Sequence, residues 1–360
     1  MRTCGVAVLG IILAIGCVAQ AGTAKKKPAK KRQDSYHPKA QQLPFRYMGP
    51  FVNLPDGSVL GVDVRQSMIS ADEGKTWKTY PLFKDNAKFQ ARPERALLRT
   101  RDGVVVMGFL NQKEIRRGKW KVHDKEALSK FYLPTYITRS LDDGKTWEEP
   151  QKIQDGWCGA IRSLIQLKTG RLVLCGQNVA FAPGRHIVLT YTSDDNGKTW
   201  TASNSLDIGG SGSHGGTMEA TVAERADGRV WMLIRTTLGW FWEADSSDGG
   251  RTWTGLRKSA IQSSTCCGML TRLASGRLSL LWNRSPVGKP YSRRSREELS
   301  IAFSTDDGKT WAEPIVIATD PGKRQSYPYL FERRPGEFWI TVMQGHARIK
   351  LLEKDLAGVK

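Results

Sequence analysis

The octapeptide Ser70-Ala-Asp72-Glu-Gly74-Lys-Thr76-Trp77 returns four more times along this chain of 360 residues. The later copies share the pattern Ser-x-Asp-x-Gly-x-Thr-Trp and begin at Ser140, Ser193, Ser246 and Ser304. The Asp carboxylate of such a loop can accept hydrogen bonds from the loop's own amides, Gly takes a positive φ, and Trp offers a large packing surface. The motif therefore predicts a structural turn, repeated from one unit of the fold to the next.

A second repeat precedes each octapeptide. Two strand-like runs are joined by a tight turn that contains glycine, at Gly57, Gly103, Gly170, Gly228, Gly276 and Gly336. Four-stranded units at this period predict a β-propeller. We therefore expect an all-β fold, a six-bladed propeller of four-stranded antiparallel blades that begin near residues 45, 92, 161, 218, 264 and 326. The sixth blade lacks an octapeptide, and we expect the stretch before residue 45 to close it as a last strand.

The first residues predict export. A short basic start, an apolar run from Cys4 to Ala19 and the sequence Ala19-Gln20-Ala21 are typical of a secretory signal peptide, which we assign to residues 1–21. The apolar run is short for a membrane span, which needs about 20 residues. A lipoprotein anchor at Cys17 is the alternative. We expect a basic linker over residues 22–42, a propeller over 43–360, and a secreted or periplasmic protein with no membrane span.

Charge points to the class of partner. The chain carries a net charge of +20, and residues 1–39 supply eight Lys or Arg against one Asp. That basic linker predicts possible contact with a cell surface, or else a solvated spacer. Cys158, Cys175, Cys266 and Cys267 match no zinc spacing, and no phosphate loop is visible. We expect a monomer without metal, cofactor or nucleic acid.

Strand direction assigns the two faces of the propeller. The glycine turns and the octapeptides fall on one face, and the starts of the inner strands and the long insertions fall on the other, which we call the top face. The insertion over residues 111–132 is basic through Lys113, Arg116, Arg117, Lys119, Lys121 and Lys125. The insertion over residues 283–296 is basic through Arg284, Lys289, Arg293, Arg294 and Arg296. A mouth this basic favours an anionic ligand.

The octapeptide is the Asp box, or bacterial neuraminidase repeat, and the chain resembles the sialidase (neuraminidase) superfamily over residues ~45 to 350, the extent of the propeller. This resemblance implies a carboxylate held by three arginines, a Tyr nucleophile assisted by a Glu, and an Asp as acid and base. The segment Gly215-Gly-Thr-Met-Glu219 resembles the one that carries the Glu. Arg235 resembles the second arginine, Arg296 the third, and Tyr327 the nucleophile.

The first blade departs from the family pattern. The family has Arg-Ile-Pro there, whereas this chain has Phe45-Arg46-Tyr47. The first arginine is therefore left open between Arg46 and Arg92 or Arg95 of the second blade. Asp63, just before the first octapeptide, is the candidate acid and base.

The resemblance implies an exo-α-sialidase-type glycosidase that removes a terminal acidic sugar from glycans. Tyr327, Glu219 and Asp63 would be its catalytic residues, and Arg235, Arg296 and Arg46 or Arg95 would bind the substrate. Two alternatives remain open at this point, because a fold does not decide a function. One is a hydrolase or lyase for uronic acids. The other is a propeller that binds acidic glycans without turning them over.

Overall fold

The computed structural model describes Met1, residues 35–284, Ser292 and residues 295–356. The expected signal peptide lies outside these residues, as does most of the linker. Within the described part of the chain, every helix is too short or too polar to cross a membrane. The cysteines at positions 158, 175, 266 and 267 are buried free thiols.

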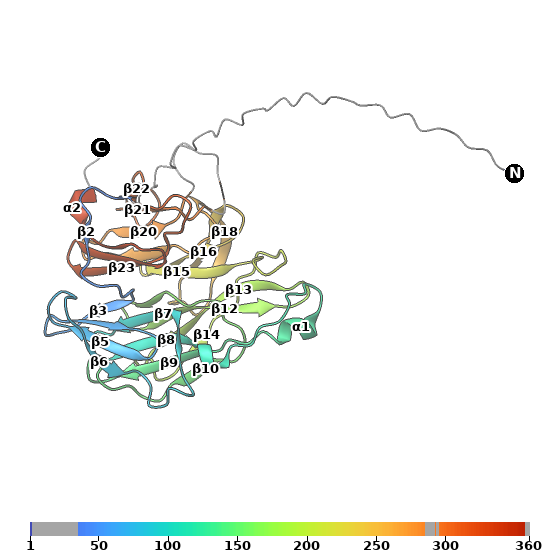
Figure 1. The fold of residues 1–360 in the computed structure, drawn as a ribbon, viewed down its shortest axis with the longest axis horizontal. Helices are drawn as coiled ribbons and strands as arrows, with labels where there is room; N and C mark the ends of the chain where they lie inside the picture. Colours follow the sequence, from blue (N-terminus) through green and yellow to red (C-terminus); the bar gives the residue numbers. More distant parts are fainter. Residues whose placement is uncertain (2–34, 285–291, 293–294, 357–360) are drawn as a thin grey trace, which may run out of the picture. The chain divides into compact units, whose positions relative to one another are not determined.

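The fold is the expected six-bladed β-propeller of four-stranded antiparallel blades, and Figure 1 follows the chain through the blades from blue to red. The first blade consists of β3 (Phe51–Asn53), β4 (Val59–Val62), β5 (Gln66–Ser70) and β6 (Lys78–Pro81). The second consists of β7 (Ala91–Arg99), β8 (Val105–Asn111), β9 (Thr135–Ser140) and β10 (Gln151–Gln154). The third consists of β11 (Leu164–Gln166), β12 (Leu172–Ala180), β13 (Arg185–Ser193) and β14 (Thr201–Ala202). The next two blades are β15 (Met218–Glu224), β16 (Val230–Arg235), β17 (Trp240–Ser246) and β18 (Thr254–Gln262); and β19 (Met269–Arg272), β20 (Leu278–Trp282), β21 (Glu298–Ser304) and β22 (Ile315–Thr319).

The sixth blade is closed by the beginning of the chain. Its strands are β23 (Ser326–Arg334), β24 (Glu337–Gln344) and β25 (Arg348–Leu352), and β2 (Gln41–Gln42) pairs with β25 as the outermost strand. β1 (Ser35–Tyr36) adds a fifth strand to the fifth blade through β22. The propeller therefore takes in residues of the segment expected to be linker.

Helices are few and short. Asn111 caps the 3-10 turn η1 (Gln112–Glu114), and Asp124 caps α1 (Lys125–Ser129) by accepting a hydrogen bond from the amide of Ala127. Both lie in the insertion after β8. The chain's last described element is α2 (Glu353–Leu356).

The Asp boxes build turns as their residues predict. In the first box Asp72 Oδ1 accepts a hydrogen bond from the amide of Thr76 at 2.9 Å, and Ser70 Oγ accepts one from the amide of Gly74 at 2.8 Å. Hydrogen bonds from the amide and hydroxyl of Thr76 and from the hydroxyl of Ser70 lower the pKa of Asp72 to about 2, the amide of Thr76 contributing most. Gly74 has a φ of 83°. The polar side chains of the box thus form hydrogen bonds within the loop itself.

Each box also joins two blades. A Cβ on Gly144, in the second box, would lie 2.6 Å from a methyl of Leu60 on β4. The fourth and fifth boxes meet Val173 on β12 and Trp231 on β16 in the same way, through Gly250 and Gly308. Hydrophobic clusters fill the spaces between neighbouring blades. The boxes therefore hold the blades in sequence.

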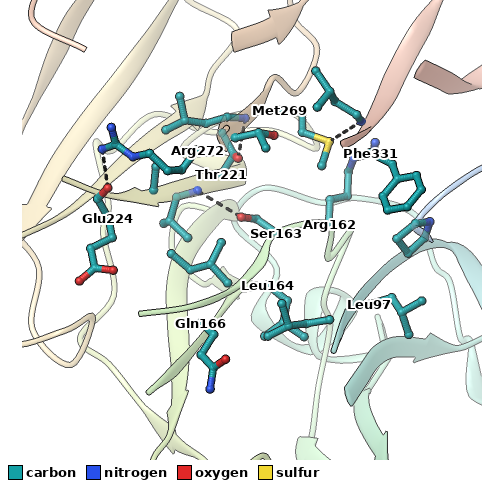
Figure 2. Close-up of a pocket in the computed structure, with 18 of the residues that line it drawn as sticks. Leu97, Arg162, Ser163, Leu164, Gln166, Thr221, Glu224, Met269, Arg272 and Phe331 are labelled. Atoms are coloured by element: carbon teal, nitrogen blue, oxygen red, sulfur yellow. Dashed lines mark hydrogen bonds between the residues drawn. The ribbon is translucent and has the colours of Figure 1, made fainter. Parts of the chain in front are cut away.

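The inner strands face the propeller axis with one edge, whose amides have no strand partner. Side chains from the preceding blade accept some of these hydrogen bonds, as Figure 2 shows: Ser163 from Val222 at 3.2 Å, and Thr221 from Leu270 at 3.0 Å. Met269 Sδ accepts one from Leu330. An exposed strand edge is a site of unwanted pairing, and these contacts protect it.

The first blade starts later than expected. β3 begins at Phe51, six residues after the expected start near residue 45. The ring of Phe45 instead packs edge-on against Trp77 of the first box, with ring centroids 5.4 Å apart. Residues 43–50 are thus a link from β2 to β3.

Candidate functional site

Three side chains meet where the inner strands of the fourth and sixth blades begin. Tyr327, on β23, donates a hydrogen bond from Oη to Glu219 Oε1 on β15 at 2.8 Å. Arg235, at the end of β16, places Nη1 2.6 Å from Glu219 Oε2 and 3.1 Å from Tyr327 Oη. The side chain of Arg235 is 3% exposed and that of Glu219 10%. The geometry thus joins a phenol, a carboxylate and a guanidinium in one buried cluster.

Two members of this cluster have a backbone in the left-handed region. Glu219 has a φ of 41° and Tyr327 a φ of 60°. The strand register shifts at Glu219, between Met218 and Thr221, whereas the register of β23 is unchanged across Tyr327 and shifts only between Glu332 and Arg334. A side chain other than glycine is strained in this region, and such strain gathers at functional sites because the surrounding structure holds it. The side chain of Glu219 is therefore aimed by a bulge in its strand, and that of Tyr327 by its left-handed backbone.

Arg296 and Arg235 converge on Thr265. Arg296 Nη2 donates to the carbonyl of Thr265 at 2.7 Å, and Arg235 Nη2 donates to its hydroxyl at 3.1 Å. The guanidinium carbon of Arg296 lies 5.4 Å from the centre of the Tyr327 ring. Gln344 accepts a further hydrogen bond from Arg296 at 3.0 Å. One point on the top face is therefore within reach of two guanidinium groups.

Arg162 is a third cation beside Tyr327. Its guanidinium carbon lies 5.4 Å from the ring centre of Tyr327 and 4.1 Å from that of Tyr329. It donates to the carbonyl of Pro328, and its Nη1 is buried without a hydrogen-bond partner among the described residues. Arg162 also lines a cavity of about 800 Å3 along the propeller axis, seen in Figure 2 between the inner strands. It therefore stands between that cavity and Tyr327.

Charge and burial set the protonation of the cluster. Burial raises the pKa of Tyr327, and the negative charge of Glu219 raises it further. Burial opposes ionisation of Glu219 too, but the charge of Arg235 and hydrogen bonds from Arg235 and Tyr327 outweigh it, so that the pKa of Glu219 is lowered. The ground state is a neutral phenol that donates to an ionised carboxylate, which suits that carboxylate to act as a base.

Cys266 reports the positive potential of this site. Cys266 and Cys267 pack against Tyr327 and are buried. Burial disfavours the thiolate of Cys266, yet a hydrogen bond with Cys267 and the charges of Arg296 and Arg235 lower its pKa to about 6. Negative charge is thus favoured at this position even without exposure to water.

Arg95 and Asp63 form a separate pair. The Arg95 side chain is 1% exposed, donates from Nη2 to the carbonyl of Val62 at 2.6 Å, and lies 3.7 Å from Asp63 Oδ1. Asp63 is 37% exposed. Tyr329 donates to the carbonyl of Arg95 at 2.9 Å. The pair is therefore next to Tyr329, and Arg162 is the side chain between it and Tyr327. Arg92 is the other candidate from the second blade. Its Nη1 donates a hydrogen bond to Gln112 Oε1 at 2.6 Å.

Arg46 lies ahead of the inner strand of the first blade. It lies on the link between β2 and β3, with an exposed side chain, and its carbonyl accepts a hydrogen bond from Arg348 at 3.0 Å. The reason is the late start of β3, which leaves Arg46 ahead of the inner strand. The role of Arg46 as a substrate-binding residue at the head of the first blade therefore stays a prediction.

The basic insertion after β8 reaches the site through one aromatic residue. Trp120 packs on His186 with ring centroids 5.1 Å apart, and Arg116 lies over the ring of Tyr132 at 4.3 Å. The side chains of Lys113, Arg117, Lys119 and Lys125 are exposed. In the second insertion, Arg284 pairs with Glu298 at 3.5 Å, whereas Lys289, Arg293 and Arg294 lie outside the described residues.

The sequence analysis assigned no role to three residues around the cluster: Thr265, where two arginines meet, and Gln177 and His186 behind Glu219. Gln177 accepts a hydrogen bond from the amide of Glu219 at 3.2 Å and contacts His186. Their positions near the top face follow from strand counting. Their partners do not, because those depend on how the third and fourth blades curve toward each other.

Comparison with known proteins places the chain in a family. Residues 118–340 match the family model for the BNR repeat-like domain. The chain belongs to this family, in the sialidase superfamily of β-propellers.

A curated sialidase of Bacteroides fragilis (strain YCH46) is 26% identical over 321 residues, covering 79% of this chain and 57% of that protein. The chain thus spans little more than half the length of this relative.

Solved structures agree on the fold. A protein of unknown function from Dyadobacter fermentans DSM 18053 is 20% identical, with a TM-score of 0.60 over 87% of this chain and 98% of that one. The intramolecular trans-sialidase of Ruminococcus gnavus is 14% identical, with a TM-score of 0.56 over 88% of this chain and 96% of that one.

Proposed function

We propose that this protein is an exported glycosidase of the exo-α-sialidase type, which removes a terminal acidic sugar from glycans. The observation that carries this proposal is the hydrogen bond from the Tyr327 phenol to the buried carboxylate of Glu219, next to Arg235. A phenol is a weak nucleophile until a base takes its proton. An ionised Glu219 is such a base.

The acidic sugar is held through its carboxylate. Arg235 and Arg296 meet at Thr265, so a carboxylate placed there receives hydrogen bonds from two planar, permanently charged groups. Arg162 adds positive charge at the face of Tyr327. A neutral phenol suits attack next to a carboxylate, because a charged nucleophile would be repelled.

The reaction then has two steps. Tyr327 gives its proton to Glu219 and bonds to the anomeric carbon, the bond to the leaving oxygen breaks, and Asp63 gives that oxygen a proton. Water next attacks the same carbon and returns a proton to Asp63, while Tyr327 leaves and takes its proton back from Glu219. Each residue ends as it began, so no cofactor is consumed.

A second candidate keeps the anion site without turnover. The ion pair of Asp63 is with Arg95, beside Tyr329, rather than within the cluster of Tyr327 and Glu219. If Asp63 does not reach the leaving oxygen, the site binds acidic glycans and releases them unchanged. This arrangement favours a binding propeller over a uronic-acid lyase, which would need a base facing C5 of the sugar.

Release of methylumbelliferone from its α-sialoside tests the proposal. We expect turnover by the purified protein, a loss of kcat of about 10³-fold or more in Tyr327→Phe, and a loss of kcat/KM of about 10- to 150-fold in Arg296→Ala, the value of one or two hydrogen bonds to a charged group. Arg251→Ala is the control, because Arg251 pairs with Asp194 in the box region of the fourth blade. Binding of acidic glycans that Arg296→Ala abolishes, with no turnover by the wild type, would select the binding propeller.

A further inference from the structure

A chain of three hydrogen bonds runs behind Glu219, through two buried residues that the proposed reaction does not use. The amide of Glu219 donates to Gln177 Oε1 at 3.2 Å. Gln177 Nε2 lies 2.8 Å from His186 Nδ1, and His186 Nε2 lies 3.0 Å from the carbonyl of Ser213. Gln177 is 3% exposed and His186 6%. The chain links the top of the third blade to the start of the fourth.

The direction of this chain follows from what each atom can do. The carbonyl of Ser213 can only accept, so His186 Nε2 carries the proton. In a neutral imidazole Nδ1 is then bare and accepts from the amide nitrogen of Gln177. That leaves Gln177 Oε1 facing the amide of Glu219, which can only donate. One proton on one nitrogen therefore orients every group in the chain.

The far end of the chain is the strained residue of the site. The ladder between β15 and β16 skips at Glu219, so its amide points out of the ladder and needs another acceptor. Backbone bonds hold the approach as well: His186 accepts from the amide of Thr217 and donates to the carbonyl of Gly215, both at 3.0 Å. His186 thus supports the bulge at Glu219 through its ring and through its backbone.

We propose that His186 is a positioning residue that acts through Gln177 to hold the strained backbone of Glu219 and so to aim its carboxylate at Tyr327. This rests on the proposed function, in which Glu219 is the base. A second proton on His186 would set an N–H against the amide nitrogen of Gln177. Rotating the side-chain amide of Gln177 by 180° would relieve this clash, but it would place Gln177 Nε2 against the backbone N–H of Glu219, so that two donors face each other. Protonation of His186 therefore breaks the chain at one end or the other.

The groups around His186 keep it neutral. The ring of Trp120 covers it from the insertion after β8, and Gln177 and Ser213 occupy its two nitrogens. Burial lowers the pKa of His186 to about 4, against the hydrogen bond to Ser213. His214 and Arg235 lower this pKa further, and Glu219 raises it. The chain is therefore intact at neutral pH.

Gln177→Leu and Gln177→Glu separate positioning from packing, because both keep the approximate size of Gln177. The leucine offers no acceptor to Glu219, whereas the glutamate keeps one and faces His186 with the other oxygen. We expect kcat to fall 10- to 100-fold in Gln177→Leu with KM within threefold of wild type. Gln177→Glu should stay within fivefold of wild type, and its kcat should not fall when His186 gains a proton, because the second carboxylate oxygen accepts a hydrogen bond from the protonated ring. His186→Phe should lower kcat about tenfold, and the exposed His123→Phe should not.

Hydrogen–deuterium exchange at the Glu219 amide, resolved by NMR, decides the same question without turnover. We expect protection in the wild type and in Gln177→Glu, and exchange at least 100-fold faster in Gln177→Leu. An unprotected Glu219 amide in the wild type, or an unchanged kcat in Gln177→Leu, would overturn the inference. If the wild type turns over no sialoside, the proposed function fails, and the exchange result still upholds or overturns the hydrogen-bonded chain.

Discussion

At the scale of single residues, the site is a set of mutually dependent charges. Glu219 is ionised because Arg235 and Tyr327 compensate for its burial, and Tyr327 is neutral because Glu219 is ionised. Removing one member changes the others, since a buried charge without its partner is costly. Arg296 meets this cluster at Thr265, so its loss should act mainly on the ligand. The residues around Tyr327 therefore divide into those that hold each other and those that remain available to a substrate.

Arg235→Met tests this dependence through stability. We expect a loss of about 3–5 kcal/mol at pH 7, because Glu219 is left buried without its cation. The exposed Arg251→Met should cost less than about 1 kcal/mol, as surface pairs usually do. Urea unfolding followed by tryptophan fluorescence measures both. Equal effects of the two variants would mean that the buried pair contributes nothing special.

The same pair predicts a pH dependence. The pKa of Glu219 is lowered from 4.5, so its contribution to stability is complete above that value and is lost as the pH falls through the lowered pKa. The stability gap between the wild type and Arg235→Met should therefore be largest near neutral pH and shrink below pH 4.5. Repeating the urea titration at pH 7, 5 and 3.5 gives the trend. A gap that widens in acid would contradict the lowered pKa.

At the scale of elements, the five Asp boxes explain how much of this structure could be predicted from the sequence. A box and a glycine turn carry their conformation in a few consecutive residues, so the number of blades and the faces could be inferred locally. Tyr327, Glu219 and Arg235 could then be placed on one face by counting along strands. The position of Arg46 is less well defined by counting, because β3 has only three residues and starts at Phe51. Gln177 and His186 were missed because their contacts join two blades.

Two glycines with the same backbone strain isolate the packing of a box. Gly144 has a φ of 88° and would place a Cβ against Leu60, whereas Gly170 has a φ of 98° and open space. We expect Gly170→Ala to cost about 1–2 kcal/mol from the left-handed backbone alone. Gly144→Ala should cost about 1–3 kcal/mol more, because Leu60 must move. Thermal unfolding measures the difference, and equal losses would mean that the box does not brace the neighbouring blade.

At the scale of the whole molecule, the described propeller is a ring of blades in which strands from the two ends of the described chain pair. β2 covers β25, and β1 covers β22, so the edges of the fifth and sixth blades are paired by residues 35–42. An unpaired edge at this place would open the ring and offer a template for aggregation. We therefore expect β1 and β2, although only two residues each, to contribute to the stability of the ring.

Two truncations test this closure directly. A chain that starts at Ser35 keeps β1 and β2, and one that starts at Leu43 lacks both. We expect the shorter chain to unfold at a lower midpoint, by roughly 2 °C for each kcal/mol that the lost strand pairing contributes, the lower end of the range for domains of about 150–250 residues. It should also aggregate more readily, as light scattering would show. Identical midpoints would mean that β1 and β2 do not contribute to the stability of the propeller.

The pairing of β2 with β25 also has a consequence in time. Gln41 lies opposite Lys350, about 300 residues later. At a synthesis rate of about 5–20 residues per second, β2 waits roughly 15 to 60 s before its partner leaves the ribosome. The ring is completed only when the oldest and the youngest parts of the chain meet. A message cut short anywhere before the codons of β25 therefore yields a protein whose β2 has no strand to pair with.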